Sequence, residues 1–289
     1  MTFVPSNLPV SGKQETPLAV PATNEQQKVL PSDFDVPFIP LIDLNLAEIP
    51  SKGLPYPKGA AISYRPYLYG EVKQISQSKI QIRGMIDHIL NGIECSFPKY
   101  DITLADLLYI GLLRKISTIG DTELMLPYVC PNCFAKNTPK VDTSVLDFDY
   151  IGVPALPIRA VMSKGTLVFK PLTVGKFIEL INDGKQEDEI AYLVYQCDGI
   201  KINNSVMPVN RESLHRYFSM ANTVDGAVLT QVDKRLYHGV KPVSVVCSNK
   251  SCNFETSIAL DGGEAYLIPF HSSDDERKKS IESKLSFGE

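Results

Sequence analysis

Two stretches of the chain read alike: residues 62–75, ISYRPYLYGEVKQI, and residues 167–180, LVFKPLTVGKFIEL. In both, apolar and aromatic residues lead to a basic residue and a proline, and a glycine and an apolar stripe at helical spacing follow. The first part predicts a half-buried strand, which the proline ends because it has no N–H to donate. The second part predicts an amphipathic helix, with buried residues Val72 and Ile75 in the first copy and Phe177, Leu180 and Ile181 in the second.

The similarity continues along the chain in the same order. Four further pairs of segments match: Ser51–Gly53 with Ser163–Gly165, Gly92-Ile93 with Gly199-Ile200, Cys130/Cys133 with Cys247/Cys252, and residues 143–147 with residues 256–261. Ordered matches at a similar separation indicate an internal duplication. We therefore predict an α+β fold made of two tandem repeated small domains. Each would contain the strand–turn–helix, further helices and a zinc-knuckle β-hairpin.

Four segments follow from this pattern and from composition. The first 40 residues are rich in proline and small polar residues, so they cannot bury enough apolar surface to offset the entropy lost on ordering. We predict a disordered or extended arm over residues 1–40, repeat domain one over 41–153, repeat domain two over 154–270 and a charged tail over 271–289.

Local signals predict individual elements within the two repeats. Thr103 is a good helix N-cap, and Asp106 completes a variant capping box for the apolar helix that follows. Asn210 is a second N-cap. Further helices are predicted over 84–91, 186–195 and 224–237, and strands over 39–49, 121–129 and 138–149.

Composition and charge exclude several classes of protein. The chain has 289 residues, a formal net charge of −4 and 44% hydrophobic residues, which argues against nucleic-acid binding driven by bulk charge. No run of about 18 apolar residues predicts a membrane span, and the first residues lack the pattern of a signal peptide. Six cysteines in a chain of this length fit a reducing compartment, which we take to be a cytoplasm or a particle assembled there.

The cysteine pairs carry the strongest chemical signal. Cys130 and Cys133 are spaced C-x2-C, and Cys247 and Cys252 are spaced C-x4-C, each pair between two predicted strands. Zinc takes four tetrahedral ligands and binds thiolates well, so the two knuckles together predict one zinc ion shared between the repeats. Two alternatives remain: four reduced cysteines left from an ancestral site, and a redox dithiol, which normally needs a helix N-terminus that the residues after Cys133 do not offer.

Signatures of catalysis are missing from the sequence. The four histidines, His88, His215, His238 and His271, stand in no zinc-protease motif and beside no obvious nucleophile. The phosphate-binding loop and the nucleophile elbow are also missing. We therefore predict that the protein is not an enzyme. Tyr64, Tyr67 and Tyr69 lie near basic residues, but the second copy has Phe169, Leu172 and Val174 at those positions, which favours packing over a nucleic-acid platform.

The order strand, Arg/Lys-Pro, amphipathic helix, short helices and cysteine knuckle resembles the baseplate-hub assembly proteins of T-even-type contractile-tail bacteriophages. The stretch Phe169–Gly175 is also similar to phage tail assembly chaperones. The resemblance covers about residues 50–270, and this chain departs from it by carrying two copies and a C-x4-C pair. It implies a non-enzymatic structural or assembly role. The protein would bind other tail or baseplate subunits, the tape measure among them, in the host cytoplasm during assembly or in the virion tail.

A second hypothesis stays open from the residues alone. The four cysteines, with Lys136, Lys140, Lys241 and Lys250 nearby, would also suit a zinc-ribbon accessory protein that binds nucleic acid. The acidic balance of the whole chain makes nucleic acid the less favoured partner.

Overall fold

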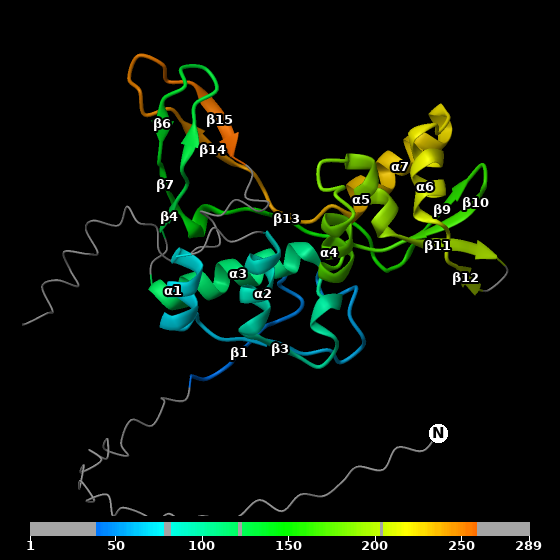
Figure 1. Cartoon of the computed structure of the whole chain (residues 1–289), viewed down its shortest axis with the longest axis horizontal. Coiled ribbons are helices and arrows are strands. Elements are labelled where there is room, and N and C mark those ends of the chain that lie inside the picture. Colours follow the sequence, from blue (N-terminus) through cyan, green and yellow to red (C-terminus); the bar gives the residue numbers. More distant parts are fainter. Residues whose placement is uncertain (1–38, 78–81, 121–122, 203–204, 259–289) are drawn as a thin grey trace, which may run out of the picture. The chain divides into compact units, whose positions relative to one another are not determined.

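The computed structural model describes residues 39–77, 82–120, 123–202 and 205–258 (Figure 1). Within these ranges the chain is mixed α+β, with helices set among several small antiparallel sheets. The predicted charged tail, and all of the predicted arm except residues 39 and 40, lie outside the described residues.

The first strand–turn–helix forms where the sequence predicts it. Strand β2 (Ile62–Tyr64) lies between β1 (Ile42–Asp43) and β3 (Ile93–Cys95) in an antiparallel sheet. Helices α1 (Tyr69–Gln77) and α2 (Ile82–Asn91) connect β2 to β3. The strand ends two residues before Pro66, and α1 buries Val72 and Ile75. The sequence therefore predicted both the end of the strand and the buried side of α1. Helix α2 buries Met85, Ile86, Ile89 and Leu90.

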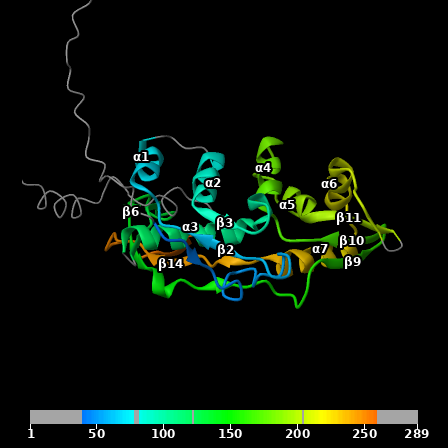
Figure 2. The ribbon, with the colours of Figure 1, turned by 90° about the horizontal axis from the view of Figure 1, so that it is seen from below.

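The second stretch gives the same order of elements. Strand β10 (Gly165–Phe169) is followed by α4 (Val174–Asn182) and α5 (Glu189–Gln196), and then by β11 (Cys197–Ile202). Figure 2 shows the two helix pairs, α1 with α2 and α4 with α5. Two edge strands, β9 (Ile158–Met162) and β12 (Ser205–Met207), complete a sheet of order β12-β11-β10-β9.

Three further helices pack on these units. The long helix α3 (Leu104–Ile119) follows the short 3-10 turn η1 (Lys99–Asp101) and buries Leu107 and Ile110 completely. Helices α6 (Arg211–Ser219) and α7 (Thr223–Leu236) follow the second unit. The predicted caps Thr103 and Asn210 accept hydrogen bonds from the N–H groups of Asp106 and Ser213. The Asp106 side chain does not return the capping-box bond, because its carboxylate accepts from Ser51 N–H and Tyr56 OH instead.

Short two-stranded ladders make up the rest of the described β structure. They pair β4 (Glu123–Met125) with β7 (Lys140–Asp142), β5 (Tyr128–Val129) with β6 (Lys136–Asn137), β8 (Phe148–Asp149) with β13 (Gly239–Val240), and β14 (Val243–Val246) with β15 (Glu255–Ile258). The strand predicted over 138–149 is interrupted, because only β7 and β8 at its two ends are strands. Thr143–Val145 is a 3-10 turn, η2, because the Asp142 carboxylate accepts from the Ser144 N–H and starts a turn there.

Most buried apolar residues of both halves form one cluster, from Ile49 to Val245, and Tyr67, Val72 and Ile75 form a second, smaller one. The halves also exchange backbone hydrogen bonds near Thr103 and Thr173. Leu104 N–H donates to Leu172 O at 2.9 Å, and Val174 N–H donates to Ile102 O at 2.8 Å. Because this contact starts both α3 and α4, the two helices take their positions from one another.

Candidate metal centre

Two hairpins position the four cysteines. Cys130 follows β5 directly and Cys247 follows β14 directly. The Cys130 N–H donates to Ala135 O, and the Cys247 N–H donates to Phe254 O, each at 2.9 Å, so each ladder continues into its turn. The residue after the second cysteine of each pair has positive φ, 58° at Phe134 and 45° at Asn253. The two turns thus share a backbone design although the second is two residues longer.

The four sulfur atoms converge on one point. All four Sγ atoms lie within 4.8 Å of one another, with Cys130 to Cys252 at 3.9 Å and Cys133 to Cys247 at 3.6 Å. Thiolates bound tetrahedrally at about 2.3 Å from zinc would stand about 3.8 Å apart. The two short distances bracket that value and far exceed the disulfide S–S length of about 2.0 Å. All four cysteines are free thiols, and the donor set fits a soft metal ion such as zinc.

Three asparagines surround the sulfurs and were missed from the sequence. Asn132 Nδ2 donates to Cys252 Sγ at 3.3 Å, and Asn249 Nδ2 donates to Cys133 Sγ at 3.8 Å, so each hairpin reaches across to the other. Asn137, which is buried, accepts from Ser248 N–H at 2.8 Å and from Ser248 Oγ. The one sequence signal for Asn132 and Asn249 was the pattern Cys-x-Asn, which both cysteine pairs share. These contacts orient the cysteine side chains and join the two hairpins.

The sulfurs influence one another electrostatically. The backbone N–H of Cys133 lowers the pKa of the Cys130 thiol to about 7. At Cys133 the Ala135 N–H acts to lower the pKa, but desolvation and the three neighbouring sulfurs outweigh it and raise the pKa to about 11. One thiolate therefore forms readily and opposes the ionisation of the next. Four thiolates at this spacing require a cation to balance their charge.

The lysines near the site are largely committed to other partners. Lys140 pairs with Glu123 at 3.3 Å, and Lys241 pairs with Asp147 at 2.5 Å and Asp149 at 3.7 Å. Lys136 and Lys250 are exposed. The basic residues that sequence reasoning grouped with the cysteines therefore do not form one positive surface.

The other residues singled out from the sequence lie in separate places. Tyr64 and Tyr67 are buried, as packing predicted, while Tyr69 is exposed. Cys95 and Cys197 are only partly buried and lie outside the four-cysteine cluster. His215 Nε2 lies 2.7 Å from a carboxylate oxygen of Asp188, which caps α5. The acidic residues 187–189 thus lie at the start of the helix that was predicted over 186–195.

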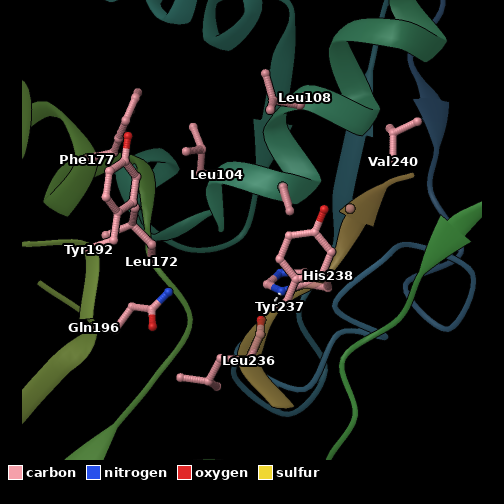
Figure 3. Close-up of a pocket in the computed structure, with 12 residues that line it drawn as sticks. Leu104, Leu108, Leu172, Phe177, Tyr192, Gln196, Leu236, Tyr237, His238 and Val240 are labelled. Atoms are coloured by element: carbon pink, nitrogen blue, oxygen red, sulfur yellow. Dashed lines mark hydrogen bonds between the residues drawn. The ribbon is translucent and has the colours of Figure 1, made fainter. Parts of the chain in front are cut away.

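An apolar cavity of about 300 Å³ lies between α3, α4, α5 and residues 236–240 (Figure 3). His238 lies against it with both ring nitrogens engaged: Nδ1 is 2.6 Å from Leu236 O and Nε2 is 3.3 Å from Thr103 Oγ1. Gln196 Oε1 is buried there without a hydrogen-bond partner among the described residues. The cavity offers apolar surface and one amide oxygen.

Comparison with protein-family models, curated protein sequences and solved structures finds no match to this chain. Among the helices of the described ranges, none combines the length and apolarity that crossing a membrane requires.

Proposed function

We propose that Cys130, Cys133, Cys247 and Cys252 bind one zinc ion in a structural site shared by two zinc-knuckle hairpins. The observation that carries the proposal is the convergence of four sulfurs within 4.8 Å from segments more than 110 residues apart. A zinc ion with four thiolates has no open position for water or substrate, so such a site stabilises a fold and performs no reaction. The ion would join the hairpin of residues 128–137 to that of residues 243–258.

A recurring contact supports the further proposal that the chain is a tandem duplication. Asp106 in the first turn of α3 accepts from Ser51 N–H at 3.0 Å and from Tyr56 OH. Asp225 in the first turn of α7 accepts from Ser163 N–H at 3.0 Å and from Tyr217 OH. Both serines begin a Ser-Lys-Gly segment, and both aspartates donate their N–H to the N-cap side chain. The serine–aspartate contact thus recurs in both halves, while the tyrosine donors come from different elements, the loop before β2 and helix α6.

For the whole protein we propose a non-enzymatic structural or assembly role in a phage tail baseplate hub. It would bind other tail subunits, the tape measure among them, during assembly in the host cytoplasm. The support is the resemblance of the strand–turn–helix and knuckle order, together with a closed four-cysteine site suited to a scaffold. A nucleic-acid role receives less support, because Lys140 and Lys241 are paired with carboxylates.

The metal proposal is tested by elemental analysis of the full chain purified under reducing conditions. We expect one zinc per chain, lost in Cys130→Ser and in Cys247→Ser and kept in the control Cys95→Ser. Because binding free energy in such sites is folding free energy, loss of zinc should lower Tm by about 10 °C. Metal-free wild-type protein, or equal zinc content in all four proteins, would refute the site.

The assembly role is tested separately by affinity purification of the tagged chain from phage-infected cells, followed by mass spectrometry. Tail or baseplate subunits should co-purify at a defined ratio with the wild type. A purification that recovers no tail component sinks the assembly role and leaves the metal result standing.

A further inference from the structure

The edge of the four-stranded sheet at β9 is open within the described residues. Strand β9 pairs with β10 alone. Its pairs run from Met162 with Gly165 to Ile158 with Phe169, and Ser163-Lys164 form a two-residue turn between them. The Val161 side chain is 76% exposed. Such an edge carries backbone groups that an added strand can use.

The register shows which backbone groups face outward. In an antiparallel pair, hydrogen-bonded and non-hydrogen-bonded residue pairs alternate, and the pair that closes a two-residue turn is hydrogen-bonded. Val161 and Arg159 therefore belong to the non-hydrogen-bonded pairs, with N–H and C=O pointing away from β10. Across the described part of the chain, no hydrogen bond to these four groups occurs. Two residues thus offer two donors and two acceptors to a neighbour.

A groove runs along this edge, with a volume of about 620 Å³. One wall is Ile158–Val161, four consecutive residues, so the groove follows the edge of the strand and not only one of its faces. The other wall is a stripe on α7 that includes Val224, Ala227, Val228 and Gln231. Val224 is 73% exposed. A strand laid here would bond to β9 and press alternate side chains against the helix.

The charges at the groove select the occupant. Its charged lining residues are Arg159 and Arg235, both exposed, and no ion pair of either guanidinium occurs among the described residues. A second copy of this chain would bring four guanidinium groups together and is disfavoured by repulsion. An acidic residue on the partner would meet unpaired guanidinium groups that can bind a carboxylate through two hydrogen bonds.

We propose that the groove between β9 and α7 binds an extended peptide segment of a partner protein, which adds a strand to β9. The segment carries apolar side chains at alternate positions and an acidic residue beside them. The inference rests on the register, the groove and its charges, and it does not depend on the zinc site or on the assembly role.

The test is fluorescence anisotropy with the full chain. The probe is a labelled eight-residue peptide that alternates valine and threonine between two flanking glutamates. Replacing the glutamates by lysines should weaken binding about tenfold, and Arg159→Glu should reverse that preference. Methylation of alternate backbone amides should abolish binding, because the added strand then cannot donate hydrogen bonds.

Two proline variants provide a matched pair. Val161→Pro removes an outward N–H on β9 and should weaken binding about tenfold. Val206→Pro removes an N–H on β12, the strand at the opposite edge of the sheet, and should leave binding unchanged. Val206 is a matched position because it pairs with Lys201, next to the Ile202–Ser205 pair, just as Val161 pairs next to the Met162–Gly165 pair. Absence of binding to the wild type, or equal loss in both variants, overturns the proposal. A concentration-dependent dimer that Val161→Pro disrupts would also overturn it, since the occupant would then be a second copy.

Discussion

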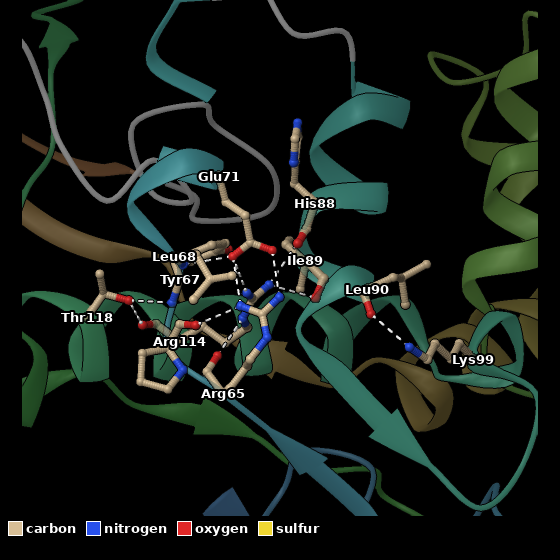
Figure 4. Close-up of polar contacts among 11 residues, drawn as sticks. Arg65, Tyr67, Leu68, Glu71, His88, Ile89, Leu90, Lys99, Arg114 and Thr118 are labelled. Carbon is tan, nitrogen blue, oxygen red and sulfur yellow. Dashed lines mark hydrogen bonds and ion pairs between the residues drawn. The ribbon is translucent and has the colours of Figure 1, made fainter. Parts of the chain in front are cut away.

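In the first strand–turn–helix Arg65 donates two hydrogen bonds to Glu71, at 2.8 and 2.9 Å (Figure 4). The side chain of Arg114, from α3, lies beside this pair and has no exposed surface. In the second unit Lys170 and Lys176 share Asp198 at 2.7 Å each, and all three side chains remain partly exposed. The positions that follow each strand are charged in both copies. One copy has built its network around a fully buried arginine, while in the other all three charged side chains are partly exposed.

The buried network depends on the shape of Arg114. Its Nε donates to Arg65 O at 2.8 Å, its Nη1 donates to His88 O and Ile89 O, and its Nη2 donates to Glu71 at 3.2 Å. The guanidinium also lies 3.9 Å from the centre of the Tyr67 ring. Only a planar guanidinium provides donors in so many directions. The last carbonyls of α2 are thereby satisfied from another helix.

The glycines at equivalent places serve different neighbours. A Cβ at Gly92 would lie 2.0 Å from the Arg114 guanidinium carbon, whereas a Cβ at Gly199, where φ is 148°, would lie 2.2 Å from Met207 O on β12. Gly70, which the two copies share with Gly175, faces open space. A repeated letter in the two copies therefore does not imply a repeated physical requirement.

The largest expected effect separates the two networks. Arg114→Met should lower the free energy of unfolding by about 3–5 kcal/mol, because it removes the buried donor to three carbonyl oxygens and one of the two arginines that pair with Glu71. Lys176→Met should cost about 1 kcal/mol or less, because Asp198 keeps its ion pair with Lys170 and all three side chains are partly exposed. Urea unfolding of both variants measures the difference. Equal losses would mean that burial does not distinguish the two units.

A smaller effect tests what the two halves share. Asp106→Asn replaces one accepting oxygen by a donor facing Ser51 N–H or Tyr56 OH, and it should cost about 1–3 kcal/mol. Asp225→Asn should shift the urea midpoint in the same direction, since its carboxylate has the matching partners Ser163 and Tyr217. The exposed Glu212→Gln serves as the control and should shift nothing. A neutral result at either aspartate would argue against equivalent halves.

The smallest expected effect is a pH dependence. Burial would raise the pKa of Glu71, but hydrogen bonds from Arg65 and Leu68 and the charge of Arg114 outweigh it and hold the pKa below its ordinary value of 4.5. At Asp198 burial likewise acts to raise the pKa, but the hydrogen bonds and charges of Lys170 and Lys176 outweigh it and hold the pKa below its ordinary value of 3.8. Both carboxyls have a lower pKa in the folded protein than in the unfolded chain. Each carboxylate therefore stabilises the fold at pH values above its ordinary pKa, and this contribution is lost as the pH falls through the pKa of the folded state.

Urea unfolding between pH 3 and pH 6 separates these two contributions. Glu71→Gln should flatten the loss of stability below about pH 4.5, and Asp198→Asn should flatten only its more acidic part. Salt at about 1 M should weaken the partly exposed Asp198 contribution more than that of Glu71. Identical pH profiles for the two variants would show that the two carboxylates experience the same environment.

Features that depend on residues close together in the sequence were predicted more often than those that depend on distant residues. The ends of β2 and β10, the N-caps Thr103 and Asn210 and the buried side of α1 were predicted correctly. The capping box at Asp106 was not, because Tyr56 and Ser51, about 50 residues away, take its carboxylate. The strand predicted over 138–149 is broken in its middle, because the Asp142 carboxylate accepts from the Ser144 N–H and starts a turn there.

By itself the sequence determined the local units of this protein: strands ended near proline, helices begun at their caps, and cysteine pairs each placed in a hairpin turn. Such features depend on backbone geometry and on side chains a few residues apart. The pattern of two cysteine pairs also predicted that Cys130 and Cys133 meet Cys247 and Cys252, and the structure brings them together. Only the tertiary structure decided that Arg114 lies beneath the first unit and that β9 is an open edge among the described residues. Those outcomes require long loops to close, and their free energy comes from burial and charge pairing between distant segments.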